Sequence, residues 1–335
     1  MKAIVCTIYG PPEVLQLQEV EKPTPKDDEV LVKIYATAVT ASDCIVRGFK
    51  LPRWHPLGFM MGLVVGFSAP RNPVLGMVLA GEVESVGQKV SRFTMGDQVY
   101  GSTVKSSNDI RFGAYAQYIS LPEDSLITIK PTNLTYEEAA AIPYGFGLAI
   151  SYLKKGNIEY RQKTLIYGAS GAIGTTAVQL AKAFGVEVTG VCSTRNLDLV
   201  RSLGADKVID YTNEDALPRG ERYDLVLDAV GKSKSSKLKE ECQKALTPDG
   251  KYISVDDGSP KNSIEELSFL NELVETGKLK AVIDRSYPLE EIVEAHRYVD
   301  QEHKRGNVVI NVVQDDSLAP AAIGRSAETA GAPDG

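Results

Sequence analysis

A glycine-rich segment, GASGAIG at residues 168–174, is the first stretch whose residue types and spacing could do chemistry. It follows an apolar strand expected at 164–167 and opens a helix expected to begin near Ala172. Backbone N–H groups at the start of a helix, together with the helix dipole, bind phosphate groups. A strand, a glycine turn and a helix in this order are the context that a dinucleotide-binding fingerprint requires. The pattern here is A-x-G-x-x-G, with Ala169 where the first glycine usually lies.

Hydroxyl and guanidinium side chains occupy the sequence positions at which dinucleotide-binding proteins contact the ribose of the cofactor. The next expected strand ends in GVCSTR, which places Ser193 and Arg195 about 20 residues past the glycine motif, where NAD-binding proteins carry an acid. These groups suit a 2′-phosphate, which a carboxylate would repel. The sequence therefore predicts NADPH as the cofactor. A tight turn without a ligand and an exposed arginine at a helix start remain the structural alternatives.

Two kinds of segment would position these residues. Short alternating strands such as EVLVKIYATAV (29–39) and MVLAGEVESVG (77–87) predict a β-rich unit before about residue 125. From 126 onward strands alternate with helices, which predicts a parallel sheet covered on both faces. The first of these helices should start at a capping box made by Thr135 and Glu138. The Ala-, Gly-, Pro- and Ser-rich residues 314–335 predict a disordered tail.

Composition and charge exclude several classes of partner. A net charge of −7 and a pI near 5.3 argue against a nucleic-acid partner. No Lys/Arg block and no apolar run of about 20 residues occurs, so neither an electrostatic membrane-surface role nor a membrane span is expected. The apolar segment 56–70 is expected to form a loop or short helix lining a pocket or an interface. Four scattered cysteines without a C-x-x-C pair indicate reduced thiols in a cytoplasmic protein.

Several strings between residues 1 and 313 together resemble the medium-chain dehydrogenase/reductase superfamily. They are GPPEVLQLQEVEKPTPKDDEVLVKI, GEVESVGQKVSRFTMGDQVYG, GAYAQYISLP, SLGADKVIDY and GNVVI. More narrowly they are similar to its zinc-free quinone oxidoreductase branch. The resemblance implies an α/β fold with a GroES-like β-rich catalytic domain at 1–125, completed by 284–313. It also implies a Rossmann domain with a doubly wound parallel sheet at 126–283, and a possible homodimer.

The positions at which zinc-dependent relatives hold their metal lack the expected ligands. The resemblance places a cysteine within AVTASD (38–43), a histidine at Met77 and a third ligand within IPYGFG (142–147), and the sequence has none of these. Cys44 and His55 are eleven residues apart, which is not zinc spacing. His296 is expected to be a half-buried packing residue. No bound metal is therefore expected.

The resemblance also assigns roles to individual residues. For the cofactor, the pyrophosphate would be lined by Ser170, Gly171, Ala172 and Ile173, the adenosine 2′-phosphate by Ser193, Arg195 and Tyr211, and the nicotinamide by Val230 and Asn307. Thr40 stands where relatives often have an asparagine beside the nicotinamide. Tyr144 is the first candidate for the proton donor. A packed tyrosine at a domain hinge, with solvent as the donor, is the alternative.

The missing metal ligands limit the classes of reaction that the protein is expected to catalyse. Without a Lewis acid, an alkoxide developing from a simple ketone has no metal to stabilise it. Hydride addition to a quinone or an enone gives a delocalised anion that a few hydrogen-bond donors can stabilise. The sequence therefore predicts an NADPH-dependent, zinc-independent reductase of a small quinone or α,β-unsaturated carbonyl. Two alternatives stay open: an enoyl-thioester reductase, and a low-turnover NADPH-binding regulatory or crystallin-like protein.

Overall fold

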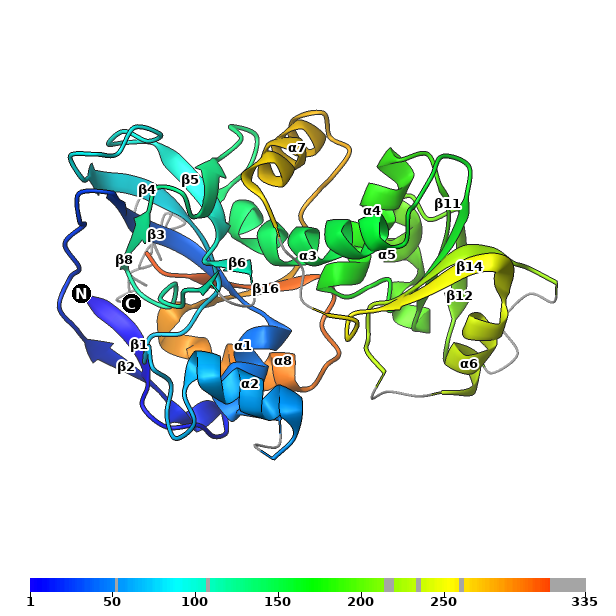
Figure 1. Cartoon of the computed structure of the whole chain (residues 1–335), viewed down its shortest axis with the longest axis horizontal. Coiled ribbons are helices and arrows are strands. Elements are labelled where there is room, and N and C mark those ends of the chain that lie inside the picture. Colours follow the sequence, from blue (N-terminus) through cyan, green and yellow to red (C-terminus); the bar gives the residue numbers. More distant parts are fainter. Residues whose placement is uncertain (52–53, 107–108, 214–219, 233–235, 259–261, 314–335) are drawn as a thin grey trace, which may run out of the picture.

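The structure is a computed structural model that describes residues 1–51, 54–106, 109–213, 220–232, 236–258 and 262–313. Its two large sheets form two domains that lie one after the other along the long axis of the molecule (Figure 1). The tail predicted at 314–335 lies outside the described residues.

A seven-stranded sheet forms the first domain. Its order is β15-β16-β3-β4-β5-β9, and β8 also pairs with β3. The strands are β3 (Glu29–Val39), β4 (Val78–Val86), β5 (Gln98–Ser102), β8 (Tyr118–Pro122), β9 (Leu126–Ile129), β15 (Ile283–Pro288) and β16 (Asn307–Asn311). Because β9 pairs with β5, residues 126–129 belong to this sheet and not to the second domain. Two small antiparallel pairs accompany it: β1 (Lys2–Cys6) with β2 (Leu15–Glu19), and β6 (Val104–Ser106) with β7 (Asp109–Ile110).

Three α-helices of the first domain gather on one side of it (Figure 1). They are α1 (Ala41–Gly48), α2 (Pro56–Val65) and α8 (Ile292–Asp300), with the short 3-10 turns η1 (Pro12–Val14) and η3 (Leu289–Glu291). The segment expected as a loop or short helix at 56–70 thus contains a helix, α2. Within the part of the chain that the structure describes, no helix is both long and apolar enough to cross a membrane.

The second domain is a five-stranded parallel sheet in the order β12-β11-β10-β13-β14. Its strands are β10 (Lys163–Tyr167), β11 (Glu187–Cys192), β12 (Lys207–Asp210), β13 (Tyr223–Asp228) and β14 (Leu246–Ser254); its helices are α4 (Ala172–Ala183), α5 (Leu197–Ser202), α6 (Lys237–Lys244) and α7 (Ile264–Glu275), with the 3-10 turn η2 (Thr194–Asn196). Ile166 packs in the core shared with α4, whereas its neighbour Leu165 packs with Leu238 of α6. Both faces of the sheet are therefore covered, which confirms the predicted doubly wound architecture.

Helix α3 (Tyr136–Lys155) joins the two domains. Its capping box is present: the Thr135 hydroxyl accepts from the Glu138 N–H at 3.1 Å. The sequence indicated several helical pieces here, but one helix of 20 residues runs through Pro143. Ala80 of β4 belongs to the same core cluster as the middle of α3 and the second sheet. The middle of α3 is thereby held at the junction between the sheets.

Candidate functional site

The turn after β10 is shaped by two glycines. Gly168 has a φ of +82°, a conformation that favours glycine, so it supplies the freedom that the fingerprint assigns to its first glycine. The next residue, Ala169, is fully buried and donates its N–H to the Val191 carbonyl at 3.0 Å. A Cβ added at Gly174 would lie 2.1 Å from the Gly168 oxygen. Helix α4 can therefore approach the turn only because residue 174 has no side chain.

The N-terminus of α4 is open to a ligand. Its N-cap is Gly171, and no side chain caps the helix there. The first N–H groups of a helix have no acceptor within the helix. A Cβ added at Gly171 would meet no atom closer than the Gly168 oxygen at 3.6 Å. Ala172 and Ile173 form the first turn beside this space, so four of the residues predicted to line a pyrophosphate lie together at one helix end.

Asn196 connects two of the predicted binding residues. Its side-chain N–H₂ donates to the hydroxyls of Ser170 at 3.0 Å and Ser193 at 3.1 Å. The side chain is buried, and its Oδ1 has no hydrogen-bond partner among the described residues. The sequence analysis missed Asn196, although it follows Ser193 by three residues. The contact with Ser170 comes from a separate loop and leaves no trace in local sequence.

Charged groups of both signs lie at the carboxyl ends of β11 and β12. Arg195 is exposed, and its guanidinium donates to the His303 carbonyl at 2.7 Å. Tyr211 is 47% exposed at the end of β12. The Thr194 hydroxyl donates to the Asp210 carboxylate at 2.5 Å, and this hydrogen bond lowers the pKa of Asp210. The place predicted for a 2′-phosphate therefore holds a cation and, close by, an anion.

Residues 303–307, here called the strap, connect the first domain to the glycine turn. The Gly306 N–H donates to the Ser170 carbonyl at 2.8 Å, and Gly306 has a φ of +59°. The Lys304 ammonium donates to the Gly306 carbonyl at 2.6 Å, and burial lowers the pKa of Lys304 to about 8. Asn307, predicted beside the nicotinamide, is buried and gives its side-chain N–H to the Val282 carbonyl at 3.2 Å. The strap thus holds β16 against the turn.

Val230 lies over the same turn. A Cβ added at Gly168 would be 2.6 Å from its Cγ2 atom. The loop that carries Val230 is held by the buried carboxylate of Asp228, which accepts the Val230 N–H at 3.1 Å and pairs with the Lys239 ammonium at 2.7 Å. Because this buried charge is both paired and hydrogen-bonded, it fixes the loop. The structure therefore brings Val230 next to the predicted cofactor turn.

Thr40 is engaged in starting helix α1. It is buried, its hydroxyl donates to the Asp43 carboxylate at 2.6 Å, and the Asp43 N–H donates back to that hydroxyl at 3.1 Å. Burial raises the pKa of Asp43 to about 6, against the lowering effect of these hydrogen bonds. Thr40 is therefore the N-cap of α1, and the structure shows its hydroxyl occupied within the protein.

Tyr144 of α3 and Ser42 of α1 place two hydroxyl groups 3.1 Å apart at the domain junction. Either oxygen can donate, and both side chains are only partly buried. Burial raises the pKa of the Tyr144 phenol, so the phenol keeps its proton at neutral pH. The sequence analysis proposed Tyr144 but missed Ser42. The two residues are 102 positions apart, and only the tertiary fold brings them together.

The side chains near the expected metal positions are packed inside the first domain. Met77 is buried in its core. Cys44, weighed earlier with His55, instead has its sulfur 3.4 Å from Nδ1 of His296. His296 is fully buried, where the sequence indicated half burial, because α8 packs its inner face against α1 and the sheet. Over the described residues, no three His, Cys, Asp or Glu side chains are grouped to hold a metal ion.

Comparisons with known proteins agree with this geometry. Residues 26–131 match the model of the alcohol dehydrogenase GroES-like domain, and residues 172–282 and 258–310 match two models described as zinc-binding dehydrogenase. The 2-methylene-furan-3-one reductase of Solanum lycopersicum is 34% identical over 93% of this chain and 79% of its own length. The chain belongs to the medium-chain dehydrogenase/reductase superfamily.

Further members of the superfamily support this assignment. The chloroplastic NADPH-dependent alkenal/one oxidoreductase of Arabidopsis thaliana is 32% identical over 92% of this chain and 79% of that protein. Among solved structures, the quinone oxidoreductase from Coxiella burnetii superimposes with a TM-score of 0.79 at 27% identity, covering 93% of this chain and 99% of that one. The GroES-like and Rossmann-type domains expected from the sequence are thus confirmed.

Proposed function

We propose that this superfamily member is an NADPH-dependent, zinc-independent reductase of quinones or α,β-unsaturated carbonyls. The observation that carries the proposal is the Tyr144–Ser42 hydroxyl pair, which lies between α1 and α3 at the junction of the two domains. The names of the tomato and Arabidopsis relatives, an enone-type reductase and an NADPH-dependent alkenal/one oxidoreductase, support this substrate class.

The residues at the glycine turn fit a dinucleotide. An added Cβ at Gly171 would touch no atom but the Gly168 oxygen at 3.6 Å, so a pyrophosphate would have room to reach the first N–H groups of α4, and the Oδ1 of Asn196 would accept from a ribose hydroxyl. The exposed Arg195 guanidinium, which donates to the His303 carbonyl, would pair with a 2′-phosphate. A bound NADPH would supply the hydride that reduces the acceptor.

The hydroxyl pair can complete the reaction. When the β-carbon of the acceptor gains a hydride, negative charge spreads to its carbonyl oxygen as an enolate. The Tyr144 hydroxyl then gives its proton to the enolate, and the Ser42 hydroxyl stabilises the phenolate left on Tyr144 by donating a hydrogen bond. Met77 occupies the place of a metal-ligating histidine in zinc-dependent relatives, and residues 38–43 contain no cysteine, which supports a reaction that does not use zinc.

Steady-state oxidation of NADPH with a panel of quinones, alkenals and 2-alkenones tests the proposal. We expect turnover with at least one acceptor, and we expect Tyr144→Phe to lower kcat about 100-fold because a positioned general acid is lost. The exposed Tyr160 offers a matched control: Tyr160→Phe should leave kcat unchanged.

Three outcomes would contradict the proposal in different ways. Absence of turnover with every acceptor, despite NADPH binding, would favour the low-turnover binding protein. Turnover with carrier-bound enoyl thioesters alone would favour the enoyl-thioester reductase. A purified enzyme that contains about one zinc per chain and loses activity with a chelator would overturn the zinc-independent mechanism.

A further inference from the structure

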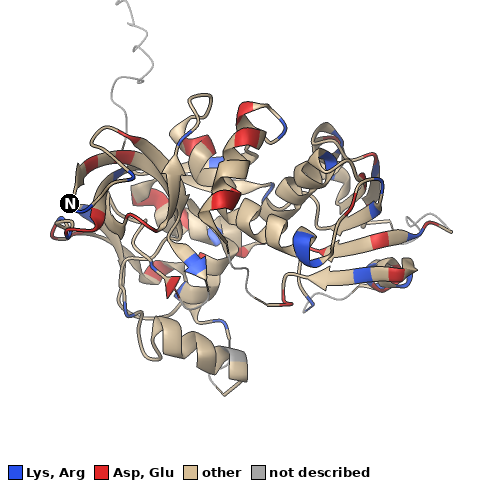
Figure 2. Cartoon of the chain, turned by 45° about the horizontal axis from the view of Figure 1, so that its top comes forward, with Lys and Arg blue, Asp and Glu red and all other residues tan. Residues whose placement is uncertain are grey.

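Helix α2 presents an apolar face to solvent. Phe59, Met60 and Leu63 on its outer side are 52%, 55% and 43% exposed, while Val65 on the inner side is buried in the core. A helix that is hydrophobic on all sides is normally buried. Figure 2 shows α2 projecting from the body of the first domain without a single charged residue along it. Contiguous exposed apolar surface of this kind marks an interaction site.

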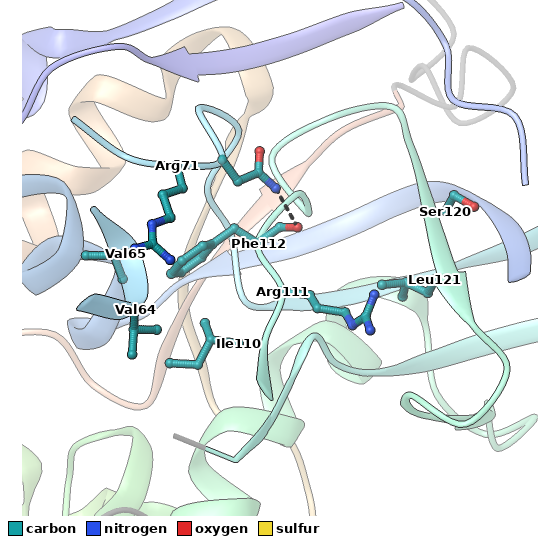
Figure 3. Close-up of a pocket in the computed structure, with 9 residues that line it drawn as sticks. Val64, Val65, Arg71, Ile110, Arg111, Phe112, Ser120 and Leu121 are labelled. Atoms are coloured by element: carbon teal, nitrogen blue, oxygen red, sulfur yellow. Dashed lines mark hydrogen bonds between the residues drawn. The ribbon is translucent and has the colours of Figure 1, made fainter. Parts of the chain in front are cut away.

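The segment of chain that contains α2 carries positive charges and no negative ones. Residues 44–81 contain no Asp or Glu, although the whole chain has a net charge of −7. At the C-terminal end of α2, a pocket of about 390 Å³ is lined by Val64 and Val65 together with the side chains of Arg71 and Arg111. Figure 3 shows Arg71 beside Val65, with Arg111 reaching toward Leu121. Arg111 also pairs with Asp109 at 3.3 Å.

We propose that α2 docks on an anionic lipid bilayer, with the pocket at its foot receiving a lipid phosphate. The apolar outer face would enter the boundary between headgroups and acyl chains, while Arg71 and Arg111 remain at headgroup level. With 10 residues, α2 is too short to cross the hydrocarbon core and would lie along the surface. Trp54 just before the helix is 85% exposed, as suits an aromatic side chain at a membrane interface.

This inference revises the expectation that the chain has no membrane-surface role. That expectation rested on overall charge and on the lack of a Lys/Arg block. The structure instead gathers an uncharged helix and two arginines from separate segments at one end of the first domain. The proposal does not depend on the proposed reaction.

The single tryptophan of the chain makes the test direct, because all tryptophan fluorescence comes from Trp54. We expect its emission to shift to the blue with vesicles of equimolar phosphatidylcholine and phosphatidylglycerol, but not with phosphatidylcholine alone. Raising the salt concentration should weaken binding. Arg71→Ala and Arg111→Ala should each weaken vesicle binding about fivefold.

The combined variant Phe59→Ser, Met60→Ser, Leu63→Ser should weaken vesicle binding at least about 100-fold. Met95, which is 74% exposed elsewhere in the first domain, gives the control: Met95→Ser should bind like the parent protein. Because the replaced side chains are exposed, we expect each variant to keep its fold. Thermal melting followed by circular dichroism checks this.

Two results would overturn the proposal. One is the same weak response to anionic and neutral vesicles. The other is a blue shift that grows with protein concentration without vesicles, is lost in the triple variant and accompanies dimer formation in analytical ultracentrifugation. That second result would assign the α2 face to a second copy of this chain.

Discussion

Arg195 and Asp210 place opposite charges at the ends of β11 and β12, where the proposed function puts the 2′ position of the bound dinucleotide. The guanidinium of Arg195 is anchored through the His303 carbonyl, and the Asp210 carboxylate is held by Thr194. A 2′-phosphate would gain a charge-assisted hydrogen bond from the arginine. A free ribose 2′-hydroxyl would gain little from it, so under the proposed function Arg195 favours NADPH over NADH.

We predict that Arg195→Ala weakens NADPH binding about 10- to 100-fold and leaves NADH binding nearly unchanged, because a charge-assisted hydrogen bond is worth about 1.5–3 kcal/mol. Isothermal titration with each dinucleotide measures the difference. Arg201→Ala is the matched control, since Arg201 is exposed on α5 and pairs with Asp198. Equal losses for NADPH and NADH would contradict the assignment of Arg195 to the 2′-phosphate.

Residues adjacent in sequence to a motif were predictable, and those that join it from elsewhere were not. The glycine turn and its helix start at Ala172 as expected, because strand, turn and helix follow one another locally. Ser42 and Asn196 act through contacts with Tyr144 and Ser170 on other elements. No periodicity or spacing in one sequence encodes such contacts.

The junction of β10 and α4 separates two roles of glycine. At Gly174 a Cβ would collide with the Gly168 oxygen, whereas at Gly171 it would make only an ordinary van der Waals contact with that oxygen at 3.6 Å. Gly174 therefore allows α4 to pack against the turn, and we assign Gly171 to the approach of a ligand.

We predict that Gly174→Ala lowers the free energy of unfolding by about 1–3 kcal/mol, as overpacking does, and lowers Tm by several degrees. Gly171→Ala should leave Tm within about 1 °C and weaken NADPH binding by at least tenfold, because its methyl group fills the space over the turn. Thermal melts and NADPH titrations of both variants check this. A destabilised Gly171→Ala protein, or a Gly174→Ala protein as stable as the parent, would refute this division of roles.

At the scale of elements, local sequence signals predicted where a helix begins better than where it ends. The capping box at Thr135 predicted the beginning of α3, and the helix then continues through Pro143 to Lys155. The packing of α3 between both sheets outweighs the local preference of proline. The apolar run at 56–70 predicted a segment that lines a pocket or an interface, and only the structure showed that the outer face of α2 is exposed.

At the scale of the whole molecule, the two domains meet at α3 and the strap. Within the first domain, the buried groups His296 and Asp43 make the free energy of unfolding depend on pH. Burial and, to a smaller extent, the Arg47 guanidinium lower the pKa of His296 to about 3, against an opposing effect of Asp300. Burial raises the pKa of Asp43 to about 6. The two groups act in opposite directions. As pH falls below 6.5, His296 takes up a proton only in the unfolded chain, which lowers the free energy of unfolding. Between pH 6 and 4, Asp43 takes up a proton in the folded chain, which raises the free energy of unfolding.

We predict that His296→Gln changes the acid response of unfolding. In the parent protein His296 is protonated only in the unfolded state between pH 6.5 and 3, so it costs about 1.4 kcal/mol of stability for each pH unit in that window. The variant lacks this proton uptake and keeps Asp43. Its free energy of unfolding in urea, relative to that of the parent, should therefore rise by about 1.4 kcal/mol per unit as pH falls from 6 to 4. A constant difference between the two proteins over this range would show that His296 titrates normally in the folded state.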